Sequence, residues 1–193
     1  MRFGRAVVAS KNQDKIAEVA QVLAGLGIVD EIIRGIDWPD VDETEPTLEG
    51  NALLKARAVA AATGFVSIAD DTGLEVDALG GAPGVHSARY AGPDASYSDN
   101  VAKLLVELGD RADRTARFRT VIAVVDPRTG DEWTAAGAVE GEIARQPRGV
   151  YGFGYDPVFA VDGRTLGEMT KEEKSEISHR ARALRPLAEV LAN

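Results

Sequence analysis

The feature that most constrains the fold is a short apolar run that leads into two neighbouring carboxylates. Residues 65–68 are largely β-branched or aromatic, which predicts a buried strand. Asp70 and Asp71 follow, and then come Thr72 and Gly73, a residue that tolerates turn conformations. We expect the strand to end at the two aspartates and to present the oxygen ligands that Mg²⁺ prefers. A cation between the two carboxylates would also relieve their mutual repulsion.

A simpler interpretation of this carboxylate pair is a charged turn that closes a strand. The flanking sequence favours a functional site at these carboxylates instead. Residues 80–84 are rich in glycine, and a hydroxyl, a cation and an aromatic ring follow at Ser87, Arg89 and Tyr90. We therefore treat Asp70 and Asp71 as candidate site residues.

The composition is that of an ordinary soluble globular protein. With 193 residues, of which 45% are hydrophobic and 27% charged, we expect one domain over residues 1–193. The net charge of -9 argues against binding to nucleic acid or to an anionic membrane. The absence of cysteine excludes disulfides, thiolate metal sites and cysteine nucleophiles. Without a signal-peptide pattern or a long apolar run, we expect a cytoplasmic protein.

A polar loop near the N-terminus is a candidate phosphate site. Residues 6–9 predict a strand, and an apolar helical spacing begins at about Asp14 and stops at Gly27. The loop 10–15 would thus lie at a helix N-terminus, where backbone N–H groups favour anions, and Lys11 and Lys15 add positive charge. The alternative is a solvated loop.

The next segment, residues 28–47, is acidic and contains proline. It predicts either a flexible loop or a loop that delivers one carboxylate to a metal site. An alanine-rich helix over residues 48–62 follows and ends at Gly64. Lys55 on this helix would ordinarily be an exposed charge.

The C-terminal half predicts a helix, a hairpin and a loop that carries aromatic residues. Residues 98–100 offer a helix cap, and residues 116–125 and 133–144 alternate as the two strands of a long hairpin. Residues 149–157 combine glycine with aromatic rings, so Phe153 or Tyr155 could stack on a planar ligand.

The last segment predicts two helices. Residues 170–173 match a capping box. Lys174, His179 and Arg180 would point in different directions on one regular helix, because each residue adds about 100°. If they share a ligand, the helix must break at or next to Ser178, which is a natural N-cap.

Together these segments resemble the inosine triphosphate pyrophosphatase family. The matching blocks occur in the family's order over nearly the whole chain, at residues 10–15, 43–44, 49–52, 55–57, 69–73, 80–85, 87–90, 152–157, 173–175 and 178–180. Three positions depart from the common pattern, namely Ser10, Thr72 and Tyr151. The first two keep a hydroxyl where threonine and serine are common.

The resemblance implies an α/β fold that is elongated and two-lobed around a long mixed β-sheet, with an active-site cleft between the lobes. It implies hydrolysis of ITP, dITP and XTP to the monophosphate and pyrophosphate, which removes deaminated purines from the nucleotide pool. It also implies Mg²⁺ as the cofactor, a purine nucleoside triphosphate as the small-molecule partner, and a homodimer.

The resemblance also assigns roles to single residues. Asp71 is the catalytic base and a metal ligand, Glu43 completes the metal site with Asp42 as an open alternative, and Thr72 contacts the substrate. Lys55 is a candidate to stabilise the departing pyrophosphate. The other substrate-binding residues form a phosphate group and a nucleoside group: Ser10, Lys11, Asn12, Gln13, Asp14 and Lys15; and Phe153, Gly154, Tyr155, Asp156, Lys174, His179 and Arg180.

The purine base is expected to be recognised by hydrogen-bond donors of the protein. Hypoxanthine and xanthine carry an oxygen at position 6, where adenine carries an amino group. Arg180 is a permanent donor and His179 can present a ring N–H, so both suit that oxygen.

Two other functional classes fit the sequence less well. A haloacid-dehalogenase-type phosphatase needs an Asp-x-Asp pair, but Ala69 stands two positions before Asp71. A non-catalytic purine nucleotide sensor could lack the carboxylates, yet Glu43, Asp70 and Asp71 are all present. The hydrolase interpretation is therefore favoured.

Overall fold

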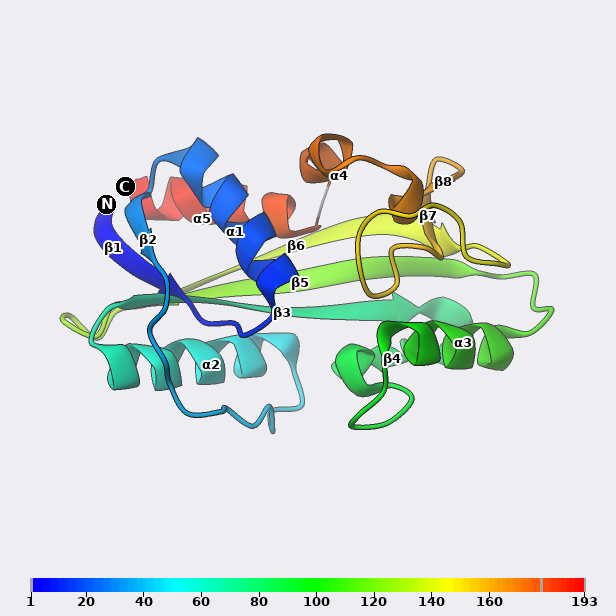
Figure 1. Cartoon of the computed structure of the whole chain (residues 1–193), viewed down its shortest axis with the longest axis horizontal. Coiled ribbons are helices and arrows are strands. Elements are labelled where there is room, and N and C mark those ends of the chain that lie inside the picture. The colour runs from blue at the N-terminus through cyan, green and yellow to red at the C-terminus, as the bar shows by residue number, and fades with distance from the viewer. Residues whose placement is uncertain (1, 178, 193) are drawn as a thin grey trace. The chain divides into compact units, whose positions relative to one another are not determined.

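The strands of the chain form one long mixed sheet (Figure 1). The structure is a computed structural model, which describes residues 2–177 and 179–192. The order of its strands is β2-β1-β3-β5-β6-β7-β8, and β4 pairs with β3. The strands are β1 (Phe3–Val8), β2 (Val29–Ile33), β3 (Val66–Val76), β4 (Pro83–Gly84), β5 (Thr115–Val125), β6 (Glu132–Ile143), β7 (Phe159–Val161) and β8 (Arg164–Thr165). Strand β1 is parallel to β2 and β3, whereas β4, β7 and β8 pair antiparallel with their neighbours.

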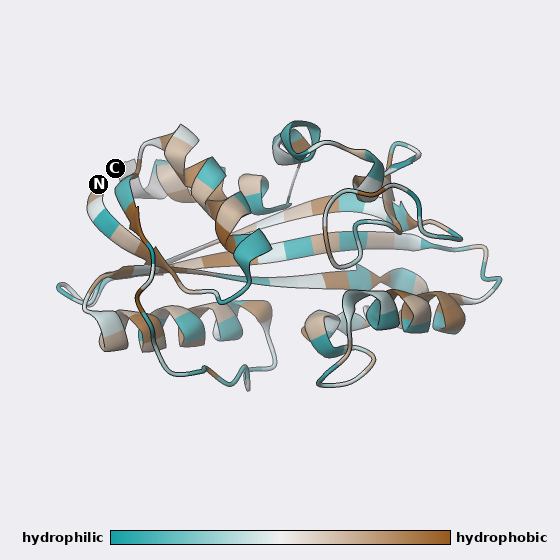
Figure 2. Ribbon diagram, in the orientation of Figure 1, coloured by the Kyte–Doolittle hydropathy of each residue, from teal (hydrophilic) through white to brown (hydrophobic). Residues whose placement is uncertain are grey.

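The α-helices of the described residues are α1 (Gln13–Leu26), α2 (Leu48–Thr63), α3 (Tyr97–Leu108), α4 (Lys171–Ile177) and α5 (His179–Ala192). Short 3₁₀ helices are η1 (Asp77–Leu79), η2 (Ser87–Arg89) and η3 (Leu166–Glu168). Hydrophobic and hydrophilic positions alternate along the helices, as Figure 2 shows. No helix in the described ranges is long and apolar enough to cross a membrane. The α/β class and the long mixed sheet are as the family resemblance implies.

The chain divides into two compact units. Unit 1 consists of residues 1–71, 120–137 and 179–193, and unit 2 of residues 72–119 and 138–178. Strands β3, β5 and β6 each continue from one unit into the other, since each spans one of these boundaries.

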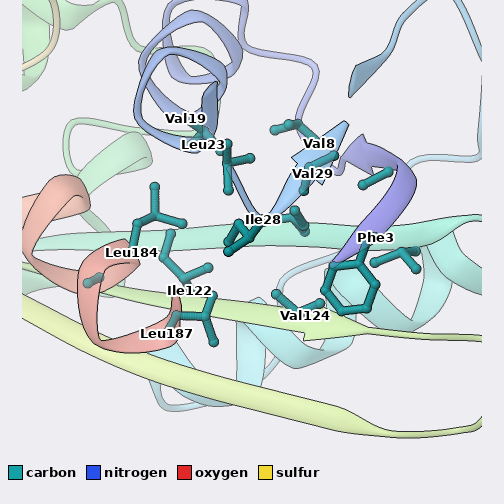
Figure 3. Packing of buried hydrophobic residues seen from close by; sticks show 14 residues of the cluster. Phe3, Val8, Val19, Leu23, Ile28, Val29, Ile122, Val124, Leu184 and Leu187 are labelled. Atoms are coloured by element: carbon teal, nitrogen blue, oxygen red, sulfur yellow. The ribbon is translucent and has the colours of Figure 1, made fainter. Parts of the chain in front are cut away.

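Unit 1 has its own hydrophobic core. Helices α1 and α5 lie on one side of its sheet and α2 lies on the other (Figure 1). Side chains from the strands meet side chains from α1 and α5 in this core (Figure 3), and they include Phe3, Val8, Val19, Leu23, Ile28, Ile122, Val124, Leu184 and Leu187. Burying one such side chain stabilises the folded protein by about 1.5–3 kcal/mol.

Unit 2 has a second core. Helix α3 lies on one side of its sheet and α4 on the other (Figure 1). Phe118 and Phe159 pack ring against ring at its centre, 4.6 Å apart. The core is completed by Leu74, Val76, Val101, Leu104, Leu108, Val139, Ile143, Val158 and Leu166.

The predicted helices are largely confirmed. Asn12 caps α1 and Gly27 ends it with a left-handed backbone, and α2 likewise ends at Gly64. Helix α3 begins earlier than predicted, because Ser96 forms a capping box with Asp99. The predicted hairpin is confirmed, since β5 and β6 are neighbours joined by a turn.

The expected end of the strand at Asp71 is wrong. Strand β3 continues to Val76, and Gly73 is part of its extended backbone rather than a turn. A Cβ on Gly73 would lie 2.7 Å from the carbonyl oxygen of Gly84 in the paired strand β4. The glycine therefore provides room for a neighbouring strand.

The segment 28–47 is not entirely a loop either. Val29–Ile33 forms the edge strand β2, which pairs in parallel with β1. Its acidic residues Asp30 and Glu31 are exposed, whereas Val29 is buried and Ile32 packs against the core of the same unit.

Helix α4 is described up to Ile177 and α5 from His179 onward, and the predicted helix break between them lies outside the described residues. Ser178, the expected N-cap, lies outside the described residues. The predicted capping box before α4 is confirmed, since Thr170 N donates to Glu173 at 2.8 Å and Glu173 N donates to Thr170 Oγ1 at 3.3 Å.

Helix α5 packs against β6 at a glycine. A Cβ on Gly137 would lie 2.4 Å from the backbone nitrogen of Ala183 and 2.5 Å from the carbonyl oxygen of His179. Only a residue without a side chain leaves room for this approach of two backbones.

We therefore predict that Gly137→Ala lowers the free energy of unfolding by about 1–3 kcal/mol, the usual cost of overpacking. Gly4→Ala is the matched control, because Gly4 is also in a strand and a Cβ there would meet nothing within 4 Å. Urea denaturation of both variants measures the difference. Equal stabilities of the two variants would contradict the packing argument.

Candidate functional site

The predicted phosphate loop joins β1 to α1 and is held by its own side chains. Asn12 Oδ1 accepts hydrogen bonds from the backbone nitrogens of Asp14 (2.9 Å) and Lys15 (3.3 Å). Ser10 Oγ accepts from Asn12 N at 3.2 Å. Asn12 thus satisfies two of the free N–H groups at the start of the helix. The loop thus lies at a helix N-terminus, as predicted, and its role in binding an anion stays a prediction.

The side chains of this loop differ in their exposure and in their partners. Lys11 and Gln13 are exposed, and Lys11 pairs with Asp40. The Lys15 side chain is only 21% exposed, and its Nζ lies 3.6 Å from Asp70 Oδ2. Beside the loop, a pocket of about 330 Å³ is lined by Ser10, Lys11, Gln13, Ile33, Arg34 and Trp38 among others.

Asp70 and Asp71 lie in the middle of β3 and point to opposite faces of the sheet. Successive side chains of a strand alternate in direction. Asp70 contacts Lys15 of α1 and Arg180 of α5, whereas Asp71 contacts Lys55 of α2, which covers the other face (Figure 1). The expectation of one cation between the two carboxylates is therefore wrong, because each has its own set of partners.

The Asp70 carboxylate is fully buried and surrounded by cations. Arg180 Nε donates to its Oδ2 at 3.0 Å, and Arg180 Nη1 donates to Glu18 at 2.7 Å. Burial alone would raise the pKa of Asp70, but Lys15, Arg180 and Lys55 together hold that pKa well below its usual range. Asp70 is thus a permanent anion within unit 1.

Asp71 is buried with fewer cations around it. Burial raises the pKa of this carboxyl, and Lys55 offsets only part of that rise. Lys55 Nζ donates to Asp71 Oδ1 at 3.0 Å and to Glu43 Oε1 at 2.5 Å, so its ammonium lies between the two predicted metal ligands. Burial opposes the charge on Lys55, but Asp71, Glu43 and Asp70 outweigh it and raise its pKa.

The donor set suits a hard cation. Asp71 Oδ2 is buried and has no hydrogen-bond partner among the residues described. An unsatisfied carboxylate oxygen in the interior is costly, and a divalent cation with oxygen ligands would satisfy it. Within the described ranges no group of three acidic or histidine side chains converges, so Glu43 and Asp71 are the protein ligands that the structure offers. Asp42 is exposed.

His179 and Arg180, which were predicted to hold the nucleoside, are in unit 1 and are 3% and 2% exposed. His179 Nδ1 lies 2.5 Å from Thr120 Oγ1. Sequence reasoning missed both Thr120 and Glu18. Of the two, only Glu18 could have been found from the sequence, because it follows Lys15 by one helical turn and both side chains leave the same face of α1.

Unit 2 brings together the other predicted nucleoside residues. Asp156 Oδ2 accepts from Phe153 N at 2.8 Å and from Lys174 Nζ at 2.6 Å, and Lys174 Nζ lies 4.7 Å from the centre of the Phe153 ring. A Cβ on Gly152 would lie 2.1 Å from Asp156 Oδ2, so the loop needs glycine there. The carboxylate fixes the aromatic loop and the lysine in one arrangement.

Of the two aromatic candidates in this loop, Phe153 is the one at a pocket. It lines, with Tyr97, Val101, Pro147, Gly154 and Pro157, an apolar pocket of about 630 Å³. Tyr155 is buried in unit 2, and its hydroxyl donates to the carbonyl of Ser87 at 2.9 Å. Thr72, the first residue of unit 2, is half-buried on β3 directly after Asp71.

Comparison with known proteins identifies relatives of nearly the same length. A dITP/XTP pyrophosphatase of Symbiobacterium thermophilum is 52% identical over 185 residues, which cover 93% of this chain and 91% of the relative. A dITP/XTP pyrophosphatase of Bacillus subtilis is 46% identical over 192 residues, 96% of each chain. The solved structure of a HAM1 protein from Coxiella burnetii has a TM-score of 0.87 at 42% identity, covering 98% of this chain and 99% of that one. Residues 6–190 match the sequence profile of the Ham1 family. The chain therefore belongs to the Ham1 family.

Proposed function

We propose that this protein hydrolyses the deaminated purine nucleotides dITP, ITP and XTP to the monophosphate and pyrophosphate. The observation that carries the substrate class is its similarity, over nearly the full length, to enzymes named dITP/XTP pyrophosphatases. The reaction class is supported by the site in unit 1, where a buried carboxylate with a raised pKa lies beside a lysine. The alternative of a non-catalytic nucleotide sensor gains no support from these relatives.

The reaction needs water to attack the α-phosphorus while the bond from that phosphorus to the bridging oxygen of the β-phosphate breaks. Asp71 takes the proton of the attacking water, and its raised pKa makes it a stronger base than an exposed aspartate. Lys11 and Lys15, which lie at the start of α1, would bind the departing pyrophosphate, because cations and the positive end of the helix dipole favour anions. Lys55 keeps Asp71 and Glu43 close together in spite of their like charge.

We further propose that Glu43 and Asp71 hold Mg²⁺. When bound, the ion supplies charge neutralisation and lowers the pKa of a coordinated water. The unsatisfied Asp71 Oδ2 supports this assignment. Two further expectations belong to the same proposal, namely a homodimer, implied by the resemblance to the inosine triphosphate pyrophosphatase family, and a cytoplasmic location, expected because the sequence shows no signal-peptide pattern.

For the base, we propose that the ring of Phe153 stacks on the purine and that Lys174 donates to its oxygen atoms. Asp156 orients both residues through two hydrogen bonds. A donor suits the 6-oxygen of hypoxanthine and xanthine, and adenine would leave it without an acceptor. Roles for His179 and Arg180 at the base stay predictions.

The direct test of the function is the rate of pyrophosphate release with dITP, XTP, dATP and dGTP at saturating Mg²⁺. We expect a strong preference for dITP and XTP. Equal kcat/KM values for all four nucleotides would contradict the proposed substrate class.

The first variant tests the general base. Asp71→Asn should bind dITP and hydrolyse it about a hundredfold more slowly or worse, because a lost general base costs about 10²–10⁴ in rate. Single-turnover rates at saturating Mg²⁺ measure the effect, and equilibrium binding of dITP in the absence of metal is the control. Turnover at the wild-type rate would remove Asp71 from the mechanism.

The second pair of variants tests the metal ligands. Glu43→Gln should raise the Mg²⁺ concentration needed for half-maximal activity by at least about tenfold, because a neutral amide is a poorer ligand than a carboxylate. Asp42→Asn is the matched control, since it neutralises the adjacent, exposed carboxylate. If Asp42→Asn shifts the Mg²⁺ titration and Glu43→Gln does not, the two assignments must be exchanged.

The third pair tests the stacking residue. Phe153→Ala should raise the KM for dITP by about tenfold or more, because stacking of an aromatic side chain on a base contributes about 1–3 kcal/mol. Tyr151→Ala is the control, because Tyr151 is an aromatic residue of the same loop that is 50% exposed. Equal KM values for the two variants would mean that Phe153 does not stack on the base.

A further inference from the structure

We infer that Asn51 is a positioning residue that holds Glu43 in place for metal binding, and that Gly50 makes this contact possible. The inference rests on the proposed function, in which Glu43 and Asp71 hold Mg²⁺. All of the residues concerned belong to unit 1.

The central contact joins α2 to the acidic loop before it. Asn51 is fully buried, and its Oδ1 accepts a hydrogen bond from the backbone nitrogen of Glu45 at 2.9 Å. Lys55 follows Asn51 by four residues, so both side chains leave the same face of the helix. Lys55 holds the Glu43 carboxylate at 2.5 Å. One helix face thus fixes the loop twice, through its backbone at Glu45 and through its carboxylate at Glu43.

Stability alone does not account for a buried asparagine at this position. Asn51 Nδ2 is buried and has no hydrogen-bond partner in the described part of the chain. A buried donor without a partner costs about 1–3 kcal/mol. An alanine would bury no such group and is favoured in a helix. What the asparagine supplies is the hydrogen bond to the loop, two residues from Glu43.

Gly50 provides the room for this contact. A Cβ on Gly50 would lie 2.7 Å from Glu45 Cβ and 3.1 Å from Thr47 Oγ1. Thr47 caps α2 by accepting from Gly50 N at 3.0 Å. Any side chain at residue 50 would therefore push the loop away from the helix, even though glycine is itself a poor helix former.

The chain offers a matched control in α3. Asn100 is also a buried helix residue, at 2% exposure, and its Oδ1 accepts from the backbone nitrogen of Ala91 at 2.7 Å. Its Nδ2 donates to the carbonyl of Ala88 at 3.1 Å. Asn100 thus connects a helix to a loop as Asn51 does, but in unit 2 and far in sequence from the carboxylates.

The experiment compares Asn51→Ala, Gly50→Ala and Asn100→Ala with the wild-type enzyme. Activity on dITP is titrated with Mg²⁺, and Mg²⁺ binding to the nucleotide-free protein is measured by calorimetry. We expect Asn51→Ala and Gly50→Ala to weaken the Mg²⁺ affinity by about 10- to 100-fold, the usual effect of losing support for a metal ligand. Their kcat at saturating Mg²⁺ should stay close to the wild-type value, and Asn100→Ala should keep the wild-type Mg²⁺ affinity.

Hydrogen exchange gives a readout that needs no metal. In the metal-free protein, the Glu45 amide should exchange faster in Asn51→Ala than in wild type and should be unchanged in Asn100→Ala. Gly50→Ala covers the case in which Asn51→Ala does not fold, because it introduces a better helix former.

Wild-type Mg²⁺ affinity in both Asn51→Ala and Gly50→Ala, or an equal loss in Asn100→Ala, would overturn the inference. A wild-type enzyme whose rate does not respond to Mg²⁺ would instead overturn the metal assignment in the proposed function. The two failures are distinguishable, because the first leaves a Mg²⁺-dependent wild-type enzyme.

Discussion

The candidate active site depends on one buried ammonium group. Lys55 lies between Glu43 and Asp71, and its side chain is 12% exposed while that of Asp71 is 7% exposed. Two carboxylates at this depth repel each other and lose hydration, so without a cation they would not stay together as anions. Lys55 offsets one of the two negative charges. The remaining charge and the unsatisfied Asp71 Oδ2 leave the site suited to a divalent cation.

The second constraint is the pleat of β3. Because neighbouring side chains of a strand point to opposite faces, Asp70 and Asp71 serve different purposes although they are adjacent. Asp70 is locked to Lys15 and Arg180 and has a lowered pKa, whereas Asp71 has a raised pKa. One carboxylate anchors α1 and α5 to the strand. The other carries the proposed chemistry.

The sequence was sufficient to predict the parts that have strong local signals. The ends of α1 at Gly27 and of α2 at Gly64 and the hairpin of β5 and β6 follow from spacing and turn residues, whereas the α/β class is implied by the family resemblance. Gly73 shows where local signals fail, since its role depends on Gly84 in another strand and not on its own neighbours. The opposite directions of Asp70 and Asp71 could not be predicted while the strand was expected to end there. Thr120, which lies beside His179, is 59 residues away in sequence, so no local pattern reveals the pair.

In the proposed reaction, water attacks the α-phosphorus of a deaminated purine nucleotide. Hydrolysis of dITP in ¹⁸O-labelled water is the direct test of this step. Mass spectrometry of the products shows which phosphorus atom accepted the oxygen of water. Attack at the α-phosphorus gives dIMP that carries one ¹⁸O atom together with unlabelled pyrophosphate. Labelled pyrophosphate with unlabelled dIMP, or release of orthophosphate and dIDP, would contradict it.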